Sequence, residues 1–431
     1  MGEEISRFSS IPGFYQIIQG NGYNCRMEIR DLIKSEEKRQ RETLMLIPSE
    51  NYASLAVREA QGSVLNNKYA EGYPGKRYYQ GNQYVDEIES IAIERAKILF
   101  GVPYANVQPY SGSPANAAVL LALISPGEKI MGMKLSAGGH LTHGQAASFS
   151  GKFFNAVQYD ADNKGFLDYD RMEEMAVKEK PKLIIAGITA YPREIKWERF
   201  ARAADKCGAY LLADISHIAG LIVAGEHPSP VPYADIIMTT THKTLRGPRG
   251  AMLLVTQKGL NRDPELDKKI DRGVFPGIQG GPHEATIAGI AIALEEAYRP
   301  EFKAYIRQVV KNAKVLAGEL SGSGLNLSTG GTDNHMMIVD LKDKGISGKE
   351  AAVALEEAGI VVNANTVPYD PGSAYKPSGI RLGTPAVTTR GMKEEEMRQI
   401  AGLIDEVLRL KNPTRDVNLR VKQLCNKYPV Q

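Results

Sequence analysis

The sequence predicts an α/β protein built on a mostly parallel sheet. Short apolar runs, too brief for helices, alternate with longer helical segments between residues 90 and 260. The runs at 182–187, 209–214, 234–239 and 251–255 are apolar almost throughout, which is typical of strands buried on both faces. Such a sheet needs helices on both sides to cover it, and the segments between the runs provide them.

Helical segments accompany these strands. Gly101 is expected to close one helix, because glycine readily adopts the left-handed conformation found at helix ends. Another helix is expected to have Ser113 as its N-cap and Pro114 at its first position. The helices expected in this part of the chain lie at 27–44 (amphipathic), 90–101, 114–127 and 197–208, with a short strand at 129–133.

A second α+β unit is predicted to follow. A long helical stretch at 283–324, broken at Pro300, leads into it and is expected to join the two units. Its expected elements are strands at 335–341, 360–365 and 379–384 and helices at 348–359 and 394–410. We therefore expect three parts: an N-terminal arm and helix (1–45), a large domain (46–299) and a small C-terminal α+β domain (300–431).

Composition favours an ordinary globular protein. The 431 residues include 53 basic and 50 acidic side chains, so a net charge of +3 gives no electrostatic reason to expect nucleic-acid or membrane binding. Three widely spaced cysteines, Cys25, Cys207 and Cys425, match no disulfide framework. The acidic N-terminal stretch lacks the apolar segment of a signal peptide. These features predict a cytoplasmic protein.

Polar side chains gather where predicted strands end. Asp214 ends one strand and His217 follows it, whereas Lys243 follows the threonines 239–241 of another. Reactive residues of open α/β sheets collect at the carboxyl ends of strands. A loop lysine is ordinarily a solvated charge, but an acid, an imidazole and an amine at one sheet edge indicate a reactive Lys243 and a pocket lined by the threonines. Thr189, Tyr191 and Arg193 follow a third strand.

A phosphate site is a further expectation. Neither a G-x-G-x-x-G nor a G-x-x-x-x-G-K-[ST] pattern is present. Instead Ser111, Gly112 and Ser113 lie at the start of a helix, where free N–H groups and the helix dipole favour an anion. A plain N-cap with a tight turn would account for the same residues.

Two histidines raise the question of a metal. His140 and His143 have an H-x-x-H spacing, but zinc requires further ligands and their loop supplies none. We therefore expect no metal. The glycines before His140 indicate close backbone approach to a flat or phosphorylated group, or a structural turn.

Pyridoxal 5′-phosphate is a cofactor that requires all of these groups together: a lysine amine, an aspartate, a ring stacked on the cofactor and a phosphate-binding site. The lysine forms a Schiff base, and the aspartate keeps the pyridine nitrogen protonated so that the ring can accept electrons.

Long motifs in one order carry a resemblance. They are "LIPSENY", "NKYAEGYPGKRYY", "QPYSGSPAN", "GGHLTHG", "HIAGLIVAG", "TTTHKTLRGPRG", "FPGIQGGP" and "SGIRLGTPAVTTRG". With them the chain resembles serine hydroxymethyltransferase from residue 40 onward. The resemblance implies a fold-type I pyridoxal-phosphate transferase, similar to aspartate aminotransferase in architecture.

The resemblance assigns cofactor contacts. Lys243 matches the Schiff-base lysine, Asp214 the partner of the pyridine nitrogen, and His140 the stacked imidazole. Tyr69 and Gly281 match groups that the other subunit of the family supplies near the phosphate, which implies at least a homodimer. The remaining implied contacts are Ser111, Gly112, Ser113, Thr189, His217, Thr240 and His242.

The resemblance also assigns substrate and folate contacts. Arg381 matches the arginine that binds the substrate carboxylate, a task suited to a guanidinium. Glu71 matches the acid/base carboxylate near the serine hydroxyl, and Ser49 and Tyr79 match substrate contacts. Around the pterin the implied residues are Leu135, Gly139, Leu141 and Asn365.

The activity implied is the reversible conversion of L-serine and tetrahydrofolate to glycine and 5,10-methylenetetrahydrofolate. Some positions depart from the pattern of the family. Thr189 stands where the family has a serine, Ser216 is an unusual residue in "DISH", and the residues after "GGHLTHG" and after "GGP" also differ. These departures leave open a 2-methylserine hydroxymethyltransferase, a folate-independent β-hydroxy amino acid aldolase, another reduced pterin, and a non-catalytic binding protein on this fold.

Overall fold

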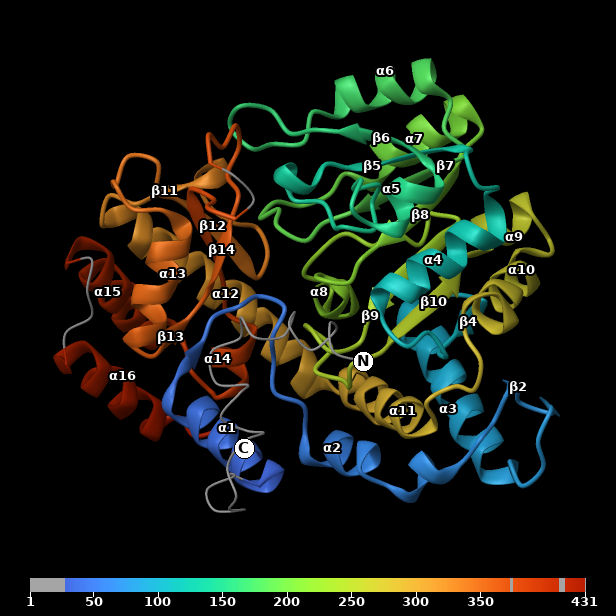
Figure 1. Ribbon diagram of the computed structural model, residues 1–431, viewed down its shortest axis with the longest axis horizontal. Coiled ribbons are helices and arrows are strands. Elements are labelled where there is room, and N and C mark those ends of the chain that lie inside the picture. The colour runs from blue at the N-terminus through green and yellow to red at the C-terminus, as the bar shows by residue number, and fades with distance from the viewer. Residues whose placement is uncertain (1–27, 373–374, 411–414, 431) are drawn as a thin grey trace, which may run out of the picture.

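A seven-stranded sheet forms the centre of the larger lobe in the computed structural model, which describes residues 28–372, 375–410 and 415–430 (Figure 1). The strand order is β4-β10-β9-β8-β7-β5-β6. All neighbouring strands from β9 to β6 are parallel, and β10 alone runs against both of its neighbours. The prediction of a mostly parallel sheet is confirmed. The strands are β4 (Tyr104–Asn106), β5 (Lys129–Met133), β6 (Asn155–Tyr159), β7 (Leu183–Gly187), β8 (Tyr210–Asp214), β9 (Ile236–Thr240) and β10 (Ala251–Val255).

Helices cover both faces of this sheet, as the apolar strands require. In β7, Leu183 and Ile185 pack in the cluster formed with α4 (Gly112–Leu123) and α10 (Leu266–Arg272). The alternate residues Ile184 and Ala186 pack on the opposite side, against helices that include α3 (Gln83–Phe100), α7 (Trp197–Cys207) and α11 (Glu284–Tyr298). Packing between two apolar layers therefore fixes the positions of the strand ends.

The start of α4 differs from the prediction. Ser111 is the N-cap and the helix begins at Gly112, so the expected capping by Ser113 and the placement of Pro114 at the first position are wrong. Ser113 and Pro114 are the second and third helical residues. A proline is tolerated there because the first N–H groups of a helix have no intrahelical acceptor. The predicted closing of α3 by Gly101 is confirmed, with a φ of 67°.

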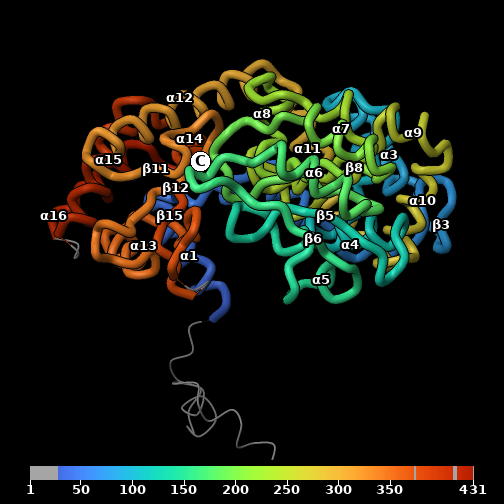
Figure 2. Tube along the Cα trace, turned by 90° about the horizontal axis from the view of Figure 1, so that it is seen from above, coloured from blue at the N-terminus to red at the C-terminus, as the bar shows by residue number. Residues whose placement is uncertain are grey.

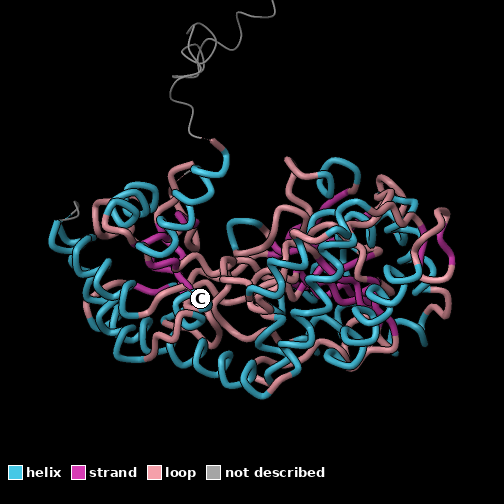
Figure 3. The backbone as a smooth tube through the Cα atoms, turned by 90° about the horizontal axis from the view of Figure 1, so that it is seen from below, coloured by secondary structure: helices cyan, strands magenta, loops and turns pink. Residues whose placement is uncertain are grey.

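The smaller lobe holds a four-stranded antiparallel sheet of order β11-β12-β15-β14. Figure 3 shows its strands as a group separate from those of the larger lobe. Its elements are β11 (Asn326–Leu327), β12 (Met336–Asp340), β14 (Asn363–Asn365), β15 (Gly379–Gly383), α13 (Gly348–Glu357), α15 (Glu394–Leu410) and α16 (Arg415–Lys427). The last helix was not predicted.

One helix, α12 (Pro300–Gly322), belongs to both cores (Figure 2). Phe302 and Ile306 pack in the large core, whereas Leu316 and Leu320 pack in the small one. The predicted break at Pro300 is confirmed, because this residue opens the helix.

The arm also joins the small core. β1 (Leu44–Met45) pairs in parallel with β13 (Ile360–Val361), and Leu44 and Leu46 are buried there. The domain boundaries at 45 and 299 stay predictions.

The N-terminal helix is confirmed as α1 (Ile29–Glu42), although none of its residues is buried. The expectation that no signal peptide is present concerns residues outside the described part. The remaining elements are α2 (Leu55–Gln61), η3 (Val64–Asn67), β2 (Gly72–Tyr73), β3 (Lys76–Arg77), η4 (Leu135–Ala137), α5 (Phe149–Phe153), α6 (Tyr169–Glu179), α8 (Ala219–Ala224), α9 (Gln257–Arg262), η5 (Gly273–Ile278), η6 (Ser328–Gly330) and α14 (Pro385–Thr389). Among the described helices none is long and apolar enough to cross a bilayer.

A buried carboxyl lies at the start of α11. Glu284 is 2% exposed, and neither of its oxygens has a hydrogen-bond partner in the described structure. Burial, reinforced by the nearby Glu89 carboxylate, raises the pKa of Glu284 from 4.5 to about 8. The folded protein therefore keeps a proton that the unfolded chain loses above pH 4.5, so stability falls as pH rises through this window.

We predict that Glu284→Gln increases the free energy of unfolding by roughly 1–3 kcal/mol at pH 8, because the amide needs no proton to stay neutral. Denaturant unfolding at pH 5 and pH 8 measures this, and the gain should shrink at pH 5. Glu296→Gln, near the other end of the same helix, serves as the control. An equal gain at both pH values would contradict the account.

Candidate functional site

The carboxyl ends of β7, β8 and β9 open onto a cavity of about 310 Å³. This volume lies at the lower end of the range for small-molecule pockets, roughly 300–1,000 Å³. The structure brings twelve predicted site residues together in its wall: Ser49, Ser111, Gly112, Ser113, His140, Thr189, Asp214, His217, Thr240, His242, Lys243 and Arg381. The predicted convergence of an acid, an imidazole and an amine at one sheet edge is thus found in the structure.

Asp214 is the buried acid of this cavity. It ends β8 and is 4% exposed. Its Oδ2 accepts hydrogen bonds from Asn116 Nδ2 and His143 Nε2, each at 3.1 Å, and its Oδ1 accepts from the Ser216 backbone N–H at 3.1 Å. Burial alone would raise the pKa of Asp214, but the hydrogen bonds from His143 and Ser216 oppose it and the pKa lies well below its ordinary range. Asp214 is therefore an anion.

The ring of His143 has a defined proton position. Its Nδ1 accepts a hydrogen bond from the His140 backbone N–H at 3.2 Å, so the proton lies on Nε2 and is donated to Asp214. His140 is fixed in a similar way, because the Thr142 backbone N–H donates to its Nδ1 at 3.2 Å. Burial lowers the pKa of His140 to about 4. Both nitrogens of His143 are thus engaged within the protein, and no group of three metal-ligating side chains occurs among the described residues.

Lys243 lies in the turn between β9 and β10. Its Nζ donates to Thr240 Oγ1 at 3.1 Å, and burial lowers its pKa from 10.5 to about 8. A substantial fraction is therefore the neutral, nucleophilic amine near neutral pH. The expectation that all three threonines line the pocket is wrong. Thr240 alone does so, because the hydroxyls of Thr239 and Thr241 donate to the carbonyls of Thr240 and Pro248.

Arg381 supplies a buried cation. It lies in β15 of the small lobe, is 7% exposed, and has no acidic partner among the described residues. Its Nε donates to Asn363 Oδ1 at 3.0 Å, and its Nη1 donates to the Thr189 carbonyl. Burial lowers the pKa of Arg381 to about 10. A buried guanidinium without a carboxylate is well suited to bind one from a ligand.

The amino end of α4 faces the same cavity through Ser111, Gly112 and Ser113. The Ser111 side chain makes no capping hydrogen bond, so its hydroxyl is available to a ligand. The Nδ1 atoms of His217 and His242 are buried and have no hydrogen-bond partner in the part of the chain that the structure describes. Burial lowers the pKa of both rings, and that of His242 to about 3.

These features fit pyridoxal phosphate. The set contains an amine with a lowered pKa, an ionised buried carboxylate, a free helix amino end for a phosphate, and unpaired buried ring nitrogens. His335, stacked behind His217 at a centroid distance of 5.7 Å, adds a second neutral ring, whose pKa burial lowers to about 3.

Four predicted residues lie together elsewhere. The rings of Tyr69 and Tyr79 meet edge to face at 5.1 Å, and a Cβ placed on Gly281 would approach the Tyr69 ring to 3.1 Å. A Cβ on Gly280, the next residue along, would lie 3.3 Å from Glu71 Oε1. None of the four lines the Lys243 cavity of its own chain, and both tyrosines are largely exposed.

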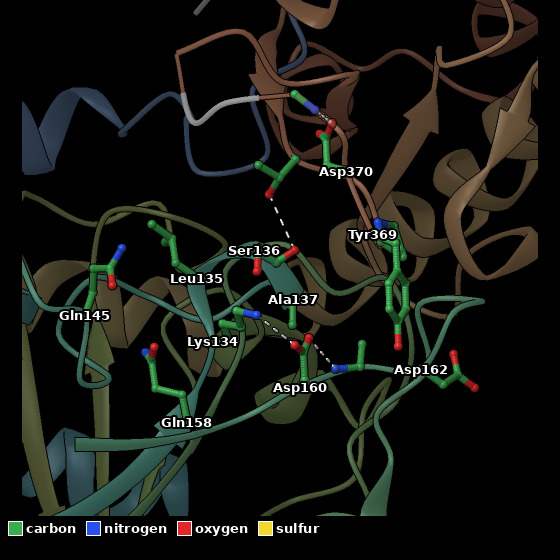
Figure 4. Close-up of a pocket in the computed structure, with 14 residues that line it drawn as sticks. Lys134, Leu135, Ser136, Ala137, Gln145, Gln158, Asp160, Asp162, Tyr369 and Asp370 are labelled. Carbon is green, nitrogen blue, oxygen red and sulfur yellow. Dashed lines mark hydrogen bonds and ion pairs between the residues drawn. The ribbon is translucent and has the colours of Figure 1, made fainter.

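The predicted pterin residues are also separate. Leu135 lines a second cavity of about 370 Å³ (Figure 4). The other lining residues are Lys134, Ser136, Ala137, Gln145, Gln158, Asp160, Ala161, Asp162, Thr366, Pro368, Tyr369, Asp370 and Gly372. The Thr366 hydroxyl donates to the Ser136 carbonyl at 3.4 Å across this cavity. Gly139, Leu141 and Asn365 line neither cavity; Leu141 is 48% exposed, and Asn365 is the last residue of β14, directly before Thr366.

Sequence reasoning missed several members of the site. Glu50 and Arg249 line the cavity. Asn116 and His143 do not line it, but both donate hydrogen bonds to Asp214. For Asn116 the sequence does contain a signal, because it is a polar residue inside the otherwise apolar helical segment "PANAAVLLAL". The H-x-x-H spacing of His143 indicates a candidate metal ligand and gives no sign of its hydrogen bond to Asp214.

Comparisons with known proteins identify relatives over most of the chain. The family model described as serine hydroxymethyltransferase matches residues 24–404. A serine hydroxymethyltransferase from Acidothermus cellulolyticus is 59% identical over 380 residues, covering 88% of this chain and 87% of its own. Those from Legionella pneumophila (strain Lens) and Nostoc sp. are 55% and 54% identical, covering 92% and 94% of this chain and 95% of their own.

We predict that His143→Ala weakens pyridoxal-phosphate binding by about 10- to 100-fold, because a hydrogen bond to a buried charge contributes roughly 1.5–3 kcal/mol. Equilibrium titration of the apoprotein measures this. His227→Ala removes an equally buried histidine outside the cavity and should lower stability without this loss. Unchanged affinity in His143→Ala would contradict the role given to its Nε2–H.

Proposed function

Since the chain belongs to the serine hydroxymethyltransferase family, we propose that the cavity around Lys243 is where it acts. The reaction is the reversible conversion of L-serine and tetrahydrofolate to glycine and 5,10-methylenetetrahydrofolate, on a fold-type I pyridoxal-phosphate scaffold. The observation that carries the location is Arg381, a buried cation without an acidic partner, in one cavity with a lysine of lowered pKa.

The cofactor would be held by residues of the large lobe. Lys243 provides the amine, Asp214 faces the pyridine nitrogen, and the amino end of α4 takes the phosphate. When bound, the cofactor supplies an electron sink for the pair released at the substrate α-carbon. His140 offers its ring face, and the remaining wall comes from Ser111, Gly112, Ser113, Thr189, His217, Thr240 and His242.

The substrate is positioned by charge. Arg381 binds the amino-acid carboxylate, with Ser49 of its own chain and Tyr79 of the partner subunit beside it, and so orients the bond to be broken. Glu71 transfers the proton of the serine hydroxyl. The unprotonated Lys243 amine is the form that reacts with the aldehyde of the cofactor, so the rate at which the apoprotein takes up pyridoxal phosphate is expected to rise with pH toward about 8.

The separation of Glu71 from the cavity supports a homodimer with shared sites. Tyr69, Glu71, Tyr79 and Gly281 form one cluster with exposed rings, and none of the four lines the Lys243 cavity of the same chain. In our proposal this cluster completes the cavity of a second copy. The pterin then lies near Leu135, Gly139, Leu141 and Asn365, at the second cavity.

We also place the protein in the cytoplasm. Cys207 and Cys425 are free thiols, as expected in a reducing compartment.

An assay of serine cleavage tests the function. Purified holoenzyme should form glycine from serine with tetrahydrofolate, and Lys243→Ala should lose at least about 1,000-fold in kcat because the nucleophile is gone. Arg381→Lys should raise the KM for serine roughly 10- to 100-fold with the loss of the planar guanidinium. Faster folate-independent cleavage, or preference for 2-methylserine, would redirect the assignment to those activities.

Mixing two inactive variants tests the shared site. In a heterodimer of Lys243→Ala and Glu71→Gln chains, one of two sites has both residues intact. With random exchange, half of the dimers are heterodimers, so about a quarter of the wild-type activity should return. Absence of recovery after confirmed subunit exchange would mean that Glu71 serves its own chain or no site.

A further inference from the structure

Glu71 lies immediately before the hairpin of β2 and β3. Figure 1 shows β2 close to α3. The Glu71 carboxylate makes no hydrogen bond or ion pair with any described residue, so its position depends on the backbone that carries it. That backbone is held closely: the Tyr78 N–H donates to the Glu71 carbonyl at 2.9 Å.

Arg77 forms hydrogen bonds with the backbone on either side of Glu71. Its Nη1 donates to the Ala70 carbonyl at 2.8 Å and to the Gly72 carbonyl at 2.9 Å. The Arg77 side chain is only 4% exposed. One guanidinium nitrogen therefore ties both flanking peptide groups to a single buried point.

The rest of the guanidinium is anchored to α3. Nε donates to Asp86 Oδ1 at 2.8 Å, and Nη2 pairs with Glu89, whose side chain is 1% exposed. Gln108 completes the anchor, because its Nε2 donates to Glu89 Oε1 at 2.7 Å and to the Gly72 carbonyl at 3.0 Å. All three guanidinium nitrogens of Arg77 donate hydrogen bonds, which fixes the orientation of the planar group.

We infer that Arg77 is the positioning residue of the Glu71 carboxylate. The inference rests on the proposed role of Glu71 in proton transfer. Arg77 does not touch the reacting atoms; it holds the Glu71 backbone against α3, so that the carboxylate meets the substrate at a set distance. Misplacement by about 1 Å is enough to cost roughly 100-fold in rate.

The test uses holoenzyme carrying Arg77→Lys, Glu71→Gln, or both. A lysine keeps the charge but cannot span two carbonyls and two carboxylates at once. Arg77→Lys should lower kcat about 10- to 100-fold while the KM for serine, set by Arg381, changes less than about threefold. Because Arg77 acts through Glu71, the double variant should be no slower than Glu71→Gln alone, and the pH–rate profile of Arg77→Lys should resemble that of Glu71→Gln.

Two further variants guard against general destabilisation. Arg95→Lys alters an arginine of α3 that, like Arg77, binds a carbonyl (Ala291) and a carboxylate (Glu295), each at 2.7 Å, and it should keep wild-type kcat within about twofold. If Arg77→Lys does not fold, Gln108→Met removes one donor to the Gly72 carbonyl and should show a smaller loss that is also absent in the Glu71→Gln background.

The outcomes separate the two claims. Wild-type kcat in Arg77→Lys, or losses that multiply in the double variant, would overturn the positioning role while leaving Glu71 in place. Wild-type kcat in Glu71→Gln would instead overturn the proposed function of Glu71, and the inference with it.

Discussion

The site depends on one buried negative charge. Asp214 ends β8 between two apolar layers, where an isolated carboxylate would take up a proton. Three donors from three segments prevent this: Asn116 from α4, His143 from the loop after β5, and the Ser216 backbone N–H. The sheet fixes the position of the Asp214 carboxylate, and the three donors keep it ionised.

The remaining polarity of the cavity follows from burial. His140, His217 and His242 are held neutral, and the amine of Lys243 is brought close to the neutral form. Arg381, whose pKa of about 10 still keeps it protonated near neutral pH, is a cation without an acidic partner among the described residues, at the small-lobe side. An amino acid carrying one carboxylate matches this distribution of charge.

The sequence predicted most of the fold and the centre of the site, because both depend on local patterns. Continuous apolar runs identified the parallel strands, and their carboxyl ends identified Asp214 and Lys243. Contacts between distant segments could not be predicted in this way. The pairing of β1 with β13, and the return of the His143 loop to Asp214, depend on tertiary packing. The start of α4 was misplaced because Ser111 and Ser113 have equal capping tendency.

The charge of Asp214 can be measured directly through the atom it faces. The protein would be reconstituted with pyridoxal phosphate labelled with ¹⁵N in the ring, and the ¹⁵N chemical shift followed from pH 6 to pH 9. The account predicts a protonated ring nitrogen throughout, because Asp214 remains an anion against it. A ring nitrogen that is neutral, or that titrates within this range, would contradict the account.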